Sequence, residues 1–422
     1  MNKRLLFLLI IILPFFLKSQ TPAADKNFGI KFSGFVKNDF FFDSRQTTDI
    51  REGHFLLYPK NINLDMDGND VNAAASFNFL SIQSRLTGKI TGPDAFGAKT
   101  SGLIEGAFFG HSNADINGFR LRHAYFKLKW EHSELLLGQS WNALFIPDCF
   151  PHVVSFNTGA PFQPFSRNPQ IRFTKSFGNF NLIVTAMSQR DFTSPGGSAS
   201  LRNSRIPNMN LKLHYKRENK AKGNMLVAGI AGDAKYLQPR LISSSGYQTN
   251  ETVEGFAGIA YLKVKTTDLT VKLEGIYGQN LYDLTMLGGY AYAYTEDTHI
   301  VNKDLYDYTT LDNLSFWTDI HTNGNKIQVG VFAGFSKNMA SLKNLKDWTS
   351  SSSYMSRGGN IDYVYRFSPR IMYNIGKIRL AAECEYTVAA YGSFETNNSL
   401  GQVQGSEEVA NLRILLAAYY FF

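Results

Sequence analysis

Cysteine and long apolar segments are scarce in this chain of 422 residues. Only Cys149 and Cys384 are present, which excludes a disulfide scaffold and a cysteine-rich metal site. We interpret them as two free thiols rather than as a pair. After residue 20, the sequence has no run of about 18 apolar residues, so it cannot cross a membrane as a helix. A membrane protein with this sequence would have to be a closed β-barrel.

Catalytic and cofactor motifs are also missing. The sequence has no nucleotide-binding loop, no Gly-x-Ser-x-Gly elbow and no closely spaced histidine–carboxylate metal signature. The segment from Asp65 to Asp70 loosely resembles the start of a calcium loop, but Asp70 stands where the turn glycine belongs and Ser76 where the closing glutamate belongs. We therefore predict no enzyme, no catalytic residue, no metal site and no cofactor.

The first residues have the layout of a secretory signal. Lys3 and Arg4 precede an apolar run from Leu5 to Leu17, which is too short to span a bilayer. We predict a cleaved signal peptide at 1–20, a short N-terminal lead at 21–29 and one barrel domain at 30–422. Cleavage would remove three positive charges and lower the net charge from +8 to +5. This mild excess is spread along the chain and argues against nucleic acid as a partner.

Alternation of apolar and polar residues is the recurrent signal in the rest of the chain. In residues 30–42, Phe32, Val36 and Phe40 share one face, and Lys31, Ser33, Lys37 and Asp39 take the other. Successive side chains of a strand point to opposite faces, so this pattern indicates a wall between lipid and water. Similar segments, sixteen in all, lie at 30–42, 76–90, 100–110, 119–130, 133–141, 169–176, 180–189, 208–217, 224–233, 253–265, 269–279, 313–322, 326–337, 360–373, 377–391 and 408–422.

The connections between these segments alternate in length. Short turns such as Glu131-His132 alternate with long polar segments, as expected of an up-and-down outer-membrane barrel with short periplasmic turns and long external loops. Both termini would then be periplasmic. The last strand ends on Phe422 and resembles the signal read by the barrel-insertion machinery of the Gram-negative outer membrane. We therefore predict an all-β, antiparallel transmembrane barrel of about sixteen strands, surrounded by outer-membrane lipid and lipopolysaccharide.

Several stretches resemble one family. They are GFVKNDFFFDS at 34–44, QSRLTGKITGPDAFGAKTSGLIEGAFFG at 83–110, FRLRHAYFKLKW and LLLGQSW within 119–141, GAPFQPFSRNPQIRFTKSFGNF at 159–180, FAGFSKN at 332–338, RFSPRIMYNIGK at 366–377 and ECEYTVAAYG at 383–392. In this order they resemble the DcaP-like porins, trimeric outer-membrane channels associated with dicarboxylates. The resemblance implies a homotrimer and a lumen narrowed by an inward-folded third loop.

The segment that matches this third loop runs from Asn142 to Asn168. It contains Pro147, Pro151, Pro161 and Pro164, whose fixed backbone angles favour a defined loop. An ordinary external loop with the same proline content is the alternative. If the loop folds inward, its acidic residue Asp148 would face the opposite wall of the lumen.

Strand parity assigns an excess of cationic side chains to the lumen. The predicted pore-lining and constriction residues are Arg85, Glu105, Arg122, Asp148, Arg167, Arg172, Arg366, Arg370, Arg379, Glu383 and Arg413. Fixed cations in such a wall raise the local concentration of anions. We expect Arg85, Arg172, Arg366 and Arg370 to meet across the constriction and to favour small anions, although these charges could also merely pair with the acidic residues.

Arg120 and Arg122 break the parity scheme, because they share a face with apolar residues such as Phe126 and Leu128. A cation at mid-bilayer costs roughly 2 to 4 kcal/mol. Either both arginines lie at the external rim, or a β-bulge near His123 turns them inward. Because RLRHAY at 120–125 is among the stretches that resemble the porin family, we favour the lumen for Arg122.

The sequence thus predicts a passive diffusion channel for small hydrophilic, preferentially anionic solutes. The resemblance adds dicarboxylates as candidates. An adhesion or scaffolding barrel that acts through its loops is an alternative, with 290–294 and 350–354 as the contact surface. A barrel hydrolase is a weaker one, because nothing selects the pairs His321 with Asp319 or His123 with Ser84.

Overall fold

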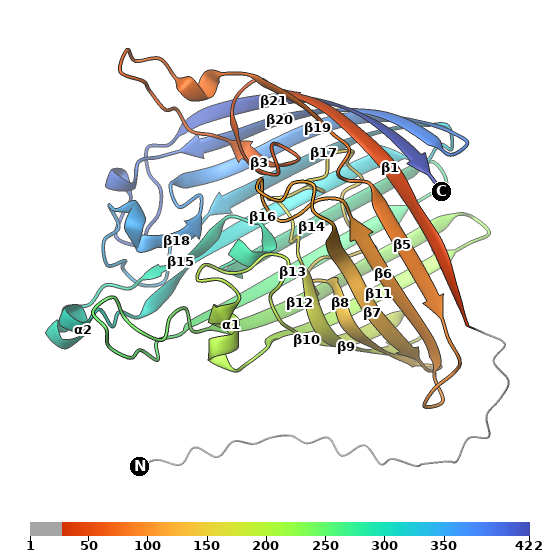
Figure 1. Ribbon diagram of the computed structural model, residues 1–422, viewed down its shortest axis with the longest axis horizontal. Helices are drawn as coiled ribbons and strands as arrows, with labels where there is room; N and C mark the ends of the chain where they lie inside the picture. The colour runs from red at the N-terminus through yellow and green to blue at the C-terminus, as the bar shows by residue number, and fades with distance from the viewer. Residues whose placement is uncertain (1–27) are drawn as a thin grey trace.

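The computed structural model describes residues 28–422, which form a closed antiparallel barrel (Figure 1). β4 and β5 are two parts of one wall strand, and β15 and β18 belong to loops, so the wall has sixteen strands, as predicted. The wall strands are β1 (Gly29–Asp43), β4 (Ser76–Leu80) with β5 (Arg85–Thr91), β6 (Lys99–Ala107), β7 (Arg120–Lys129), β8 (Ser133–Trp141), β9 (Arg167–Phe177), β10 (Phe180–Met187), β11 (Asn208–Asn219), β12 (Asn224–Leu237), β13 (Val253–Lys265), β14 (Leu269–Gln279), β16 (Tyr308–Thr322), β17 (Ile327–Asn338), β19 (Ile361–Ile375), β20 (Ile378–Tyr391) and β21 (Glu407–Phe421).

The barrel closes between its first and last strands. β1 and β21 pair in register from Phe35 opposite Phe421 to Asp43 opposite Arg413. The predicted signal peptide and most of the N-terminal lead lie outside the described residues. Among residues 28–422, no helix is long and apolar enough to cross a membrane.

Side chains alternate between the two faces of the wall because the strand period is two. Along β13, Phe256 and Leu262 are exposed on the outside, whereas Ile259 and Tyr261 are buried inside. Both cysteines are free: Cys384 lies on β20 and Cys149 is buried in a loop. The outer face is therefore apolar and suits contact with lipid.

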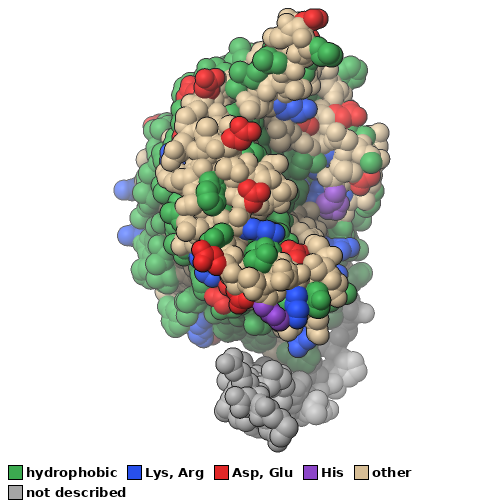
Figure 2. Space-filling view, turned by 90° about the vertical axis from the view of Figure 1, so that its left-hand side faces the viewer, with side chains coloured by type: hydrophobic (Ala, Val, Ile, Leu, Met, Phe, Trp, Pro, Cys, Tyr) green, Lys and Arg blue, Asp and Glu red, His purple; other side chains and the backbone are tan. Residues whose placement is uncertain are grey.

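Long loops gather at one end of the barrel and short turns at the other (Figure 1). Figure 2 views the loop-covered end, where charged and polar side chains gather above an apolar flank. We number the external loops 1 to 8: residues 44–75, 108–119, 142–166, 188–207, 238–252, 280–307, 339–360 and 392–406. Within them lie β2 (Thr47–Ile50), β3 (Phe55–Pro59), η1 (Val71–Ala73), α1 (Ala199–Ser204), η2 (Tyr282–Leu284), β15 (Gly288–Tyr292), α2 (Thr298–Lys303), η3 (Ser351–Ser353), β18 (Tyr354–Arg357) and η4 (Phe394–Thr396).

Three local features differ from the alternation seen in the sequence. The second wall strand is broken at 81–84, where four residues oppose three of β1, so that Ser84 Oγ accepts from the backbone N–H of Lys37. β16 begins at Tyr308, five residues earlier than expected, because it pairs with β15 above the wall. The β2–β3 hairpin of loop 1 was not expected at all.

An apolar core fills the loop-side half of the barrel. Loop 1 contributes Phe55 and Leu57, loop 3 contributes Phe162 and Phe165, and loop 6 contributes Leu284; all are buried in one cluster with wall residues. Burial of large apolar side chains is the main driving force for such packing. The loops are therefore part of the folded interior and decide which wall residues meet open space.

Candidate pore and its constriction

Loop 3 crosses the lumen and is bonded to strands around the barrel. It starts after Trp141 at the end of β8 and ends before Arg167, the first residue of β9. Near its start, Asp148 accepts from Lys216 of β11 at 2.6 Å. Further along, the carbonyl of Phe150 accepts from Lys272 Nζ of β14 at 2.8 Å. The inward-folded third loop predicted from the sequence is thus present.

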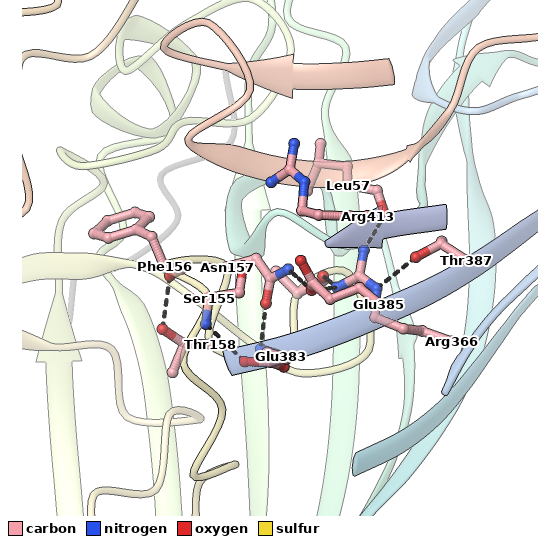
Figure 3. A network of polar contacts seen from close by, with 12 residues as sticks. Leu57, Ser155, Phe156, Asn157, Thr158, Arg366, Glu383, Glu385, Thr387 and Arg413 are labelled. Atoms are coloured by element: carbon pink, nitrogen blue, oxygen red, sulfur yellow. Dashed lines mark hydrogen bonds and ion pairs between the residues drawn. The ribbon is translucent and has the colours of Figure 1, made fainter. Parts of the chain in front are cut away.

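The middle of loop 3 is bonded to two glutamates of β20 (Figure 3). Glu383 Oε2 accepts from the backbone N–H groups of Val154 and Ser155, the latter at 2.9 Å. Glu385 Oε1 accepts from Asn157 Nδ2 at 2.6 Å. Both carboxylates are buried, so these charge-assisted hydrogen bonds are shielded from water.

Arg366 of β19 joins loops 1 and 3 to the same wall (Figure 3). Its Nη1 donates to the carbonyl of Ala160 at 2.9 Å, its Nη2 to the carbonyl of Leu57 at 2.8 Å and its Nε to Thr387 Oγ1 at 2.8 Å. Only 2 % of Arg366 is exposed. The sequence-based expectation that Arg366 borders open water therefore does not match its position.

Three other predicted pore residues on this side of the barrel also have protein partners. Arg413 binds Asp43 through two hydrogen bonds of 2.9 and 2.6 Å. Arg370 pairs with Asp319 at 2.8 Å, and Asp319 in turn accepts from the loop-3 backbone N–H of His152 at 3.2 Å. Arg379 donates to Asn374 at 2.7 Å near the periplasmic turn. We call Arg366, Arg370, Glu383, Glu385 and Arg413 the anchor residues.

A second group of arginines lies on the opposite side, between β5 and β9. Arg122 donates to Glu105 at 2.8 Å, and Arg85 lies 3.5 Å from the same carboxylate oxygen. Arg167 donates to Asp191 of loop 4 at 2.8 Å, and Arg120 pairs with the other oxygen of Asp191. We call Arg51, Arg85, Arg120, Arg122 and Arg167 the arginine cluster.

A register shift explains how two neighbouring arginines of β7 both point inward. Glu105 pairs with His123 and Gly106 with Leu121, which leaves Arg122 unopposed in β6. This is the β-bulge expected near His123. Before the bulge, Arg120 and Arg122 face the interior; after it, His123 and Lys127 do.

The ring of Phe109 and the carbonyl of Gly110 hold three of these arginines together. The guanidinium carbons of Arg51, Arg120 and Arg122 lie 4.6, 5.6 and 5.9 Å from the ring centre of Phe109, within the range of cation–π attraction. Arg51 and Arg120 also donate to one carbonyl, that of Gly110. Burial, aided by the nearby Arg122 charge, lowers the pKa of Arg51 to about 9, so it stays cationic at neutral pH.

The cluster carries more positive charge than its carboxylates can neutralise. Four of its five guanidinium groups share two carboxylates, Glu105 and Asp191, and Asp115 of loop 2 is a further acidic neighbour, so positive charges outnumber negative ones. Several buried donors, including Arg51 Nη2, Arg122 Nη1 and Arg167 Nε, are not bonded to any acceptor within residues 28–422. Buried charges of this kind are costly unless they are paired.

Two cavities border partners of the cluster, although none of its five arginines lines either of them. On the loop side, a cavity of about 500 Å³ is lined by Asp191, the acceptor for Arg120 and Arg167. On the periplasmic side, a cavity of about 350 Å³ is lined by Arg172 and Asp148. Arg172 also donates to the carbonyl of Trp141 at 2.8 Å, and Trp141 lies beneath Arg167.

Sequence reasoning missed three members of this site. Arg51 and Asp191 come from loops 1 and 4, and nothing in their local sequence distinguishes them from solvated loop charges. For Arg120, the sequence analysis left open whether the side chain lies at the external rim or in the lumen. The signal that could have placed it is its spacing of two from Arg122, because one bulge turns both inward.

Comparison with known proteins identifies the fold. No protein family profile matches the sequence, and no curated protein matches it. Among solved structures, the outer-membrane channel DcaP of Acinetobacter baumannii is similar, with a TM-score of 0.66 and 14% identity over 94% of this chain and 97% of that one.

Two further porin structures are similar. An anion-selective porin from Comamonas acidovorans has a TM-score of 0.52 and 11% identity over 94% of this chain and 100% of its own. OmpT of Vibrio cholerae, in its trimer form, has a TM-score of 0.51 and 10% identity over 94% and 99%. The resemblance to the DcaP-like porins is thus confirmed at the level of fold.

Proposed function

We propose that this chain is an outer-membrane porin that lets small hydrophilic anions diffuse passively, and that the arginine cluster is its constriction. The observation that carries this proposal is the group of arginines inside a porin-type barrel whose buried donors include several without an acceptor in residues 28–422. The anion-selective porin of Comamonas acidovorans, which shares the fold, supports it.

The predicted pore residues take two roles in this proposal. Arg85, Glu105, Arg122 and Arg167 form the constriction. Arg122 and Arg167 are as buried as Arg366, but unlike Arg366 they keep donors without an acceptor within residues 28–422. Arg172 and Asp148 line the periplasmic cavity below it. Arg366, Arg370, Glu383 and Arg413 hold loops or the closing seam, and Arg379 lies near the periplasmic turn without contact to the cluster.

Selectivity follows from electrostatics rather than from tight binding. Fixed cations in a low-dielectric wall raise the local anion concentration and repel cations. Glu105 and Asp191 offset part of the field, so that a passing anion is attracted without being trapped. Dicarboxylates fit this chemistry, because one molecule carries two negative charges.

Planar-bilayer recording in a KCl gradient tests the proposal. We expect the wild-type chain to give a reversal potential that indicates chloride preference. Arg122→Gln should reduce this preference, since this charge belongs to the cluster. Arg379→Gln is the matched control, because it removes the same charge outside the cluster and should change little. A cation-preferring wild type would refute the proposal.

We further propose that the chain resides in the Gram-negative outer membrane among lipid and lipopolysaccharide, inserted through its terminal strand, and that it forms a homotrimer. The apolar outer face and the porin fold support the location. The trimer form of Vibrio cholerae OmpT supports the assembly. An unboiled sample should migrate as a trimer on a detergent gel and as a monomer after boiling; a monodisperse monomer in mild detergent would contradict it.

A further inference from the structure

The cavity on the periplasmic side of loop 3 has a charge pattern of its own. Its volume is about 350 Å³, its wall comes from β7 to β11, and residues 146–148 of loop 3 cover it. Trp130 and Glu131, next to a periplasmic turn, border its other end. The cavity therefore lies between the constriction and the periplasm.

Half of the charged side chains around this cavity are paired with one another. Five basic and three acidic side chains line it. Lys127 pairs with Glu134 at 2.8 Å, and Lys216 pairs with Asp148 at 2.6 Å. Asp148 also lies 3.4 Å from His214, and hydrogen bonds from His214 and Lys216 keep the pKa of Asp148 well below its ordinary value. These pairs fix the edge of the cavity and leave it with an excess of two positive charges.

Lys212 of β11 and Arg172 of β9 are the unpaired exceptions in the interior of the cavity. Within residues 28–422, no carboxylate oxygen lies within 4.0 Å of either charged group. Lys212 is only 5 % exposed, and Arg172 Nε is buried without an acceptor. A buried charge is costly unless it finds a partner, so both side chains are poised to bind an anion.

The strand register brings these two cations toward one space. Lys212 pairs with Ile183 of β10, and Ile183 pairs with Thr174 of β9, two residues from Arg172. The two strands that carry the cations are thus about 10 Å apart. Both side chains are long and point inward, so they can reach one small ligand between them.

We infer that Arg172 and Lys212 form a second anion-binding site, on the periplasmic side of the constriction, that takes a small dianion. This inference rests on the proposed function for its route of entry, since anions would reach the site through the arginine cluster or from the periplasm. Two unpaired cations match two negative charges, whereas a monovalent anion leaves one cation uncompensated. Carboxylates, phosphates and sulfates share this chemistry.

Sulfate is a suitable probe because it stays a dianion across the neutral range. Isothermal titration calorimetry on the purified full chain in detergent measures its binding without any need for conduction. We expect Lys212→Met to weaken sulfate binding about tenfold, as for loss of one hydrogen bond between charged groups. The titrations are repeated in an Arg122→Gln background, which weakens any sulfate binding at the arginine cluster.

Lys129→Met is the matched control, because Lys129 lines the same cavity but is exposed at its edge. It removes the same charge and should change sulfate affinity less than twofold. Lys212→Arg should retain binding. The inference is overturned if wild-type protein does not bind sulfate, or if Lys212→Met and Lys129→Met weaken it equally. The reversal potential of the wild type is a separate measurement, so failure of the channel proposal can be told apart from failure of this site.

Discussion

Arg413 and Asp43 face each other across the seam that closes the barrel, and two hydrogen bonds of 2.9 and 2.6 Å join them inside it. Arg413 also donates to the carbonyl of Gly53 at 2.7 Å, which ties the turn of loop 1 to the same seam. Removal of one partner of a buried pair leaves an uncompensated charge. We therefore expect Arg413→Ala to lower the free energy of unfolding by about 3 to 5 kcal/mol. Urea unfolding in detergent measures it, with Arg379→Ala as a control that should cost less.

Arg366 and Arg172 should respond differently to truncation. Arg366→Ala removes three hydrogen bonds to loop 1, loop 3 and Thr387, so it should reduce stability and loosen both loops. Arg172→Ala removes one hydrogen bond beside a cavity and should cost less than about 1.5 kcal/mol. Limited proteolysis within loop 3 and urea unfolding give the two readouts. Equal stability of both variants would show that Arg366 does not hold the loops.

Gly334 of β17 allows loop 3 to approach the wall. A Cβ atom at this position would lie 2.5 Å from Cγ of Phe162, and this close approach requires glycine. We expect Gly334→Ala to displace Phe162, to cost about 1 to 3 kcal/mol and to change the conductance. Gly232→Ala on β12 is the control, because its Cβ would meet no atom within 4 Å. Identical conductance of the two variants would contradict the expectation.

Two loop histidines should make stability depend on pH. Burial lowers the pKa of His152 from 6.5 to about 2, and burial, aided by the Arg51 charge, holds the pKa of His54 well below its ordinary value. The unfolded chain takes up protons below about pH 6.5 that the folded chain does not, so stability is highest above this pH and falls as the pH decreases. Each histidine contributes at most about 1.4 kcal/mol per pH unit.

The His54→Gln, His152→Gln double variant tests this dependence. Its unfolding midpoint in urea should fall less steeply between pH 6.5 and pH 4 than that of the wild type. Parallel curves would mean that other groups cause the acid sensitivity.

The sidedness of the barrel can be tested with single cysteines. Asn323 lies in a short turn and Ser351 in loop 7, at opposite ends of the wall. In a Cys149→Ser, Cys384→Ser background, Ser351→Cys should react with a membrane-impermeant maleimide on intact cells, and Asn323→Cys only after permeabilisation. Labelling of both from outside would overturn the topology.

The wall of the barrel was predictable because its signal is local. Alternation of period two needs only neighbouring residues, and the lengths of the connections give the sidedness. The sequence did not predict the break at 81–84 or the early start of β16, because each depends on a partner strand. The partner is β1 for the break and β15 for the start of β16. The β2–β3 hairpin was not predicted, because its residues are buried by contact with loops 3 and 6 and its own sequence shows no alternation of apolar and polar residues.

For the site, the sequence predicts only on which face of its strand a side chain lies. Parity indicates that Arg85 and Arg366 point inward, but it cannot tell a side chain beside a cavity from one enclosed by a loop. The difference arises from loop 3, whose carbonyl at Ala160 is bonded to Arg366. Arg51 and Asp191 reach the cluster from loops, so their contacts depend on tertiary packing that no short segment encodes.

The unequal contacts of loop 3 have a consequence for how this protein can change. The strand residues of the arginine cluster, with Arg172 and Lys212, occupy one arc of the circumference, from β5 to β11. The anchor residues and their partners occupy another, from β16 through β21 to β1. On the first arc, Arg172 and Lys212 have no carboxylate partner within residues 28–422, so their substitution can alter the solutes admitted at the smallest cost in stability. Substitutions on the second should be tolerated mainly as compensating pairs. Evolution or protein engineering could therefore change the residues that select solutes while the anchor residues are kept.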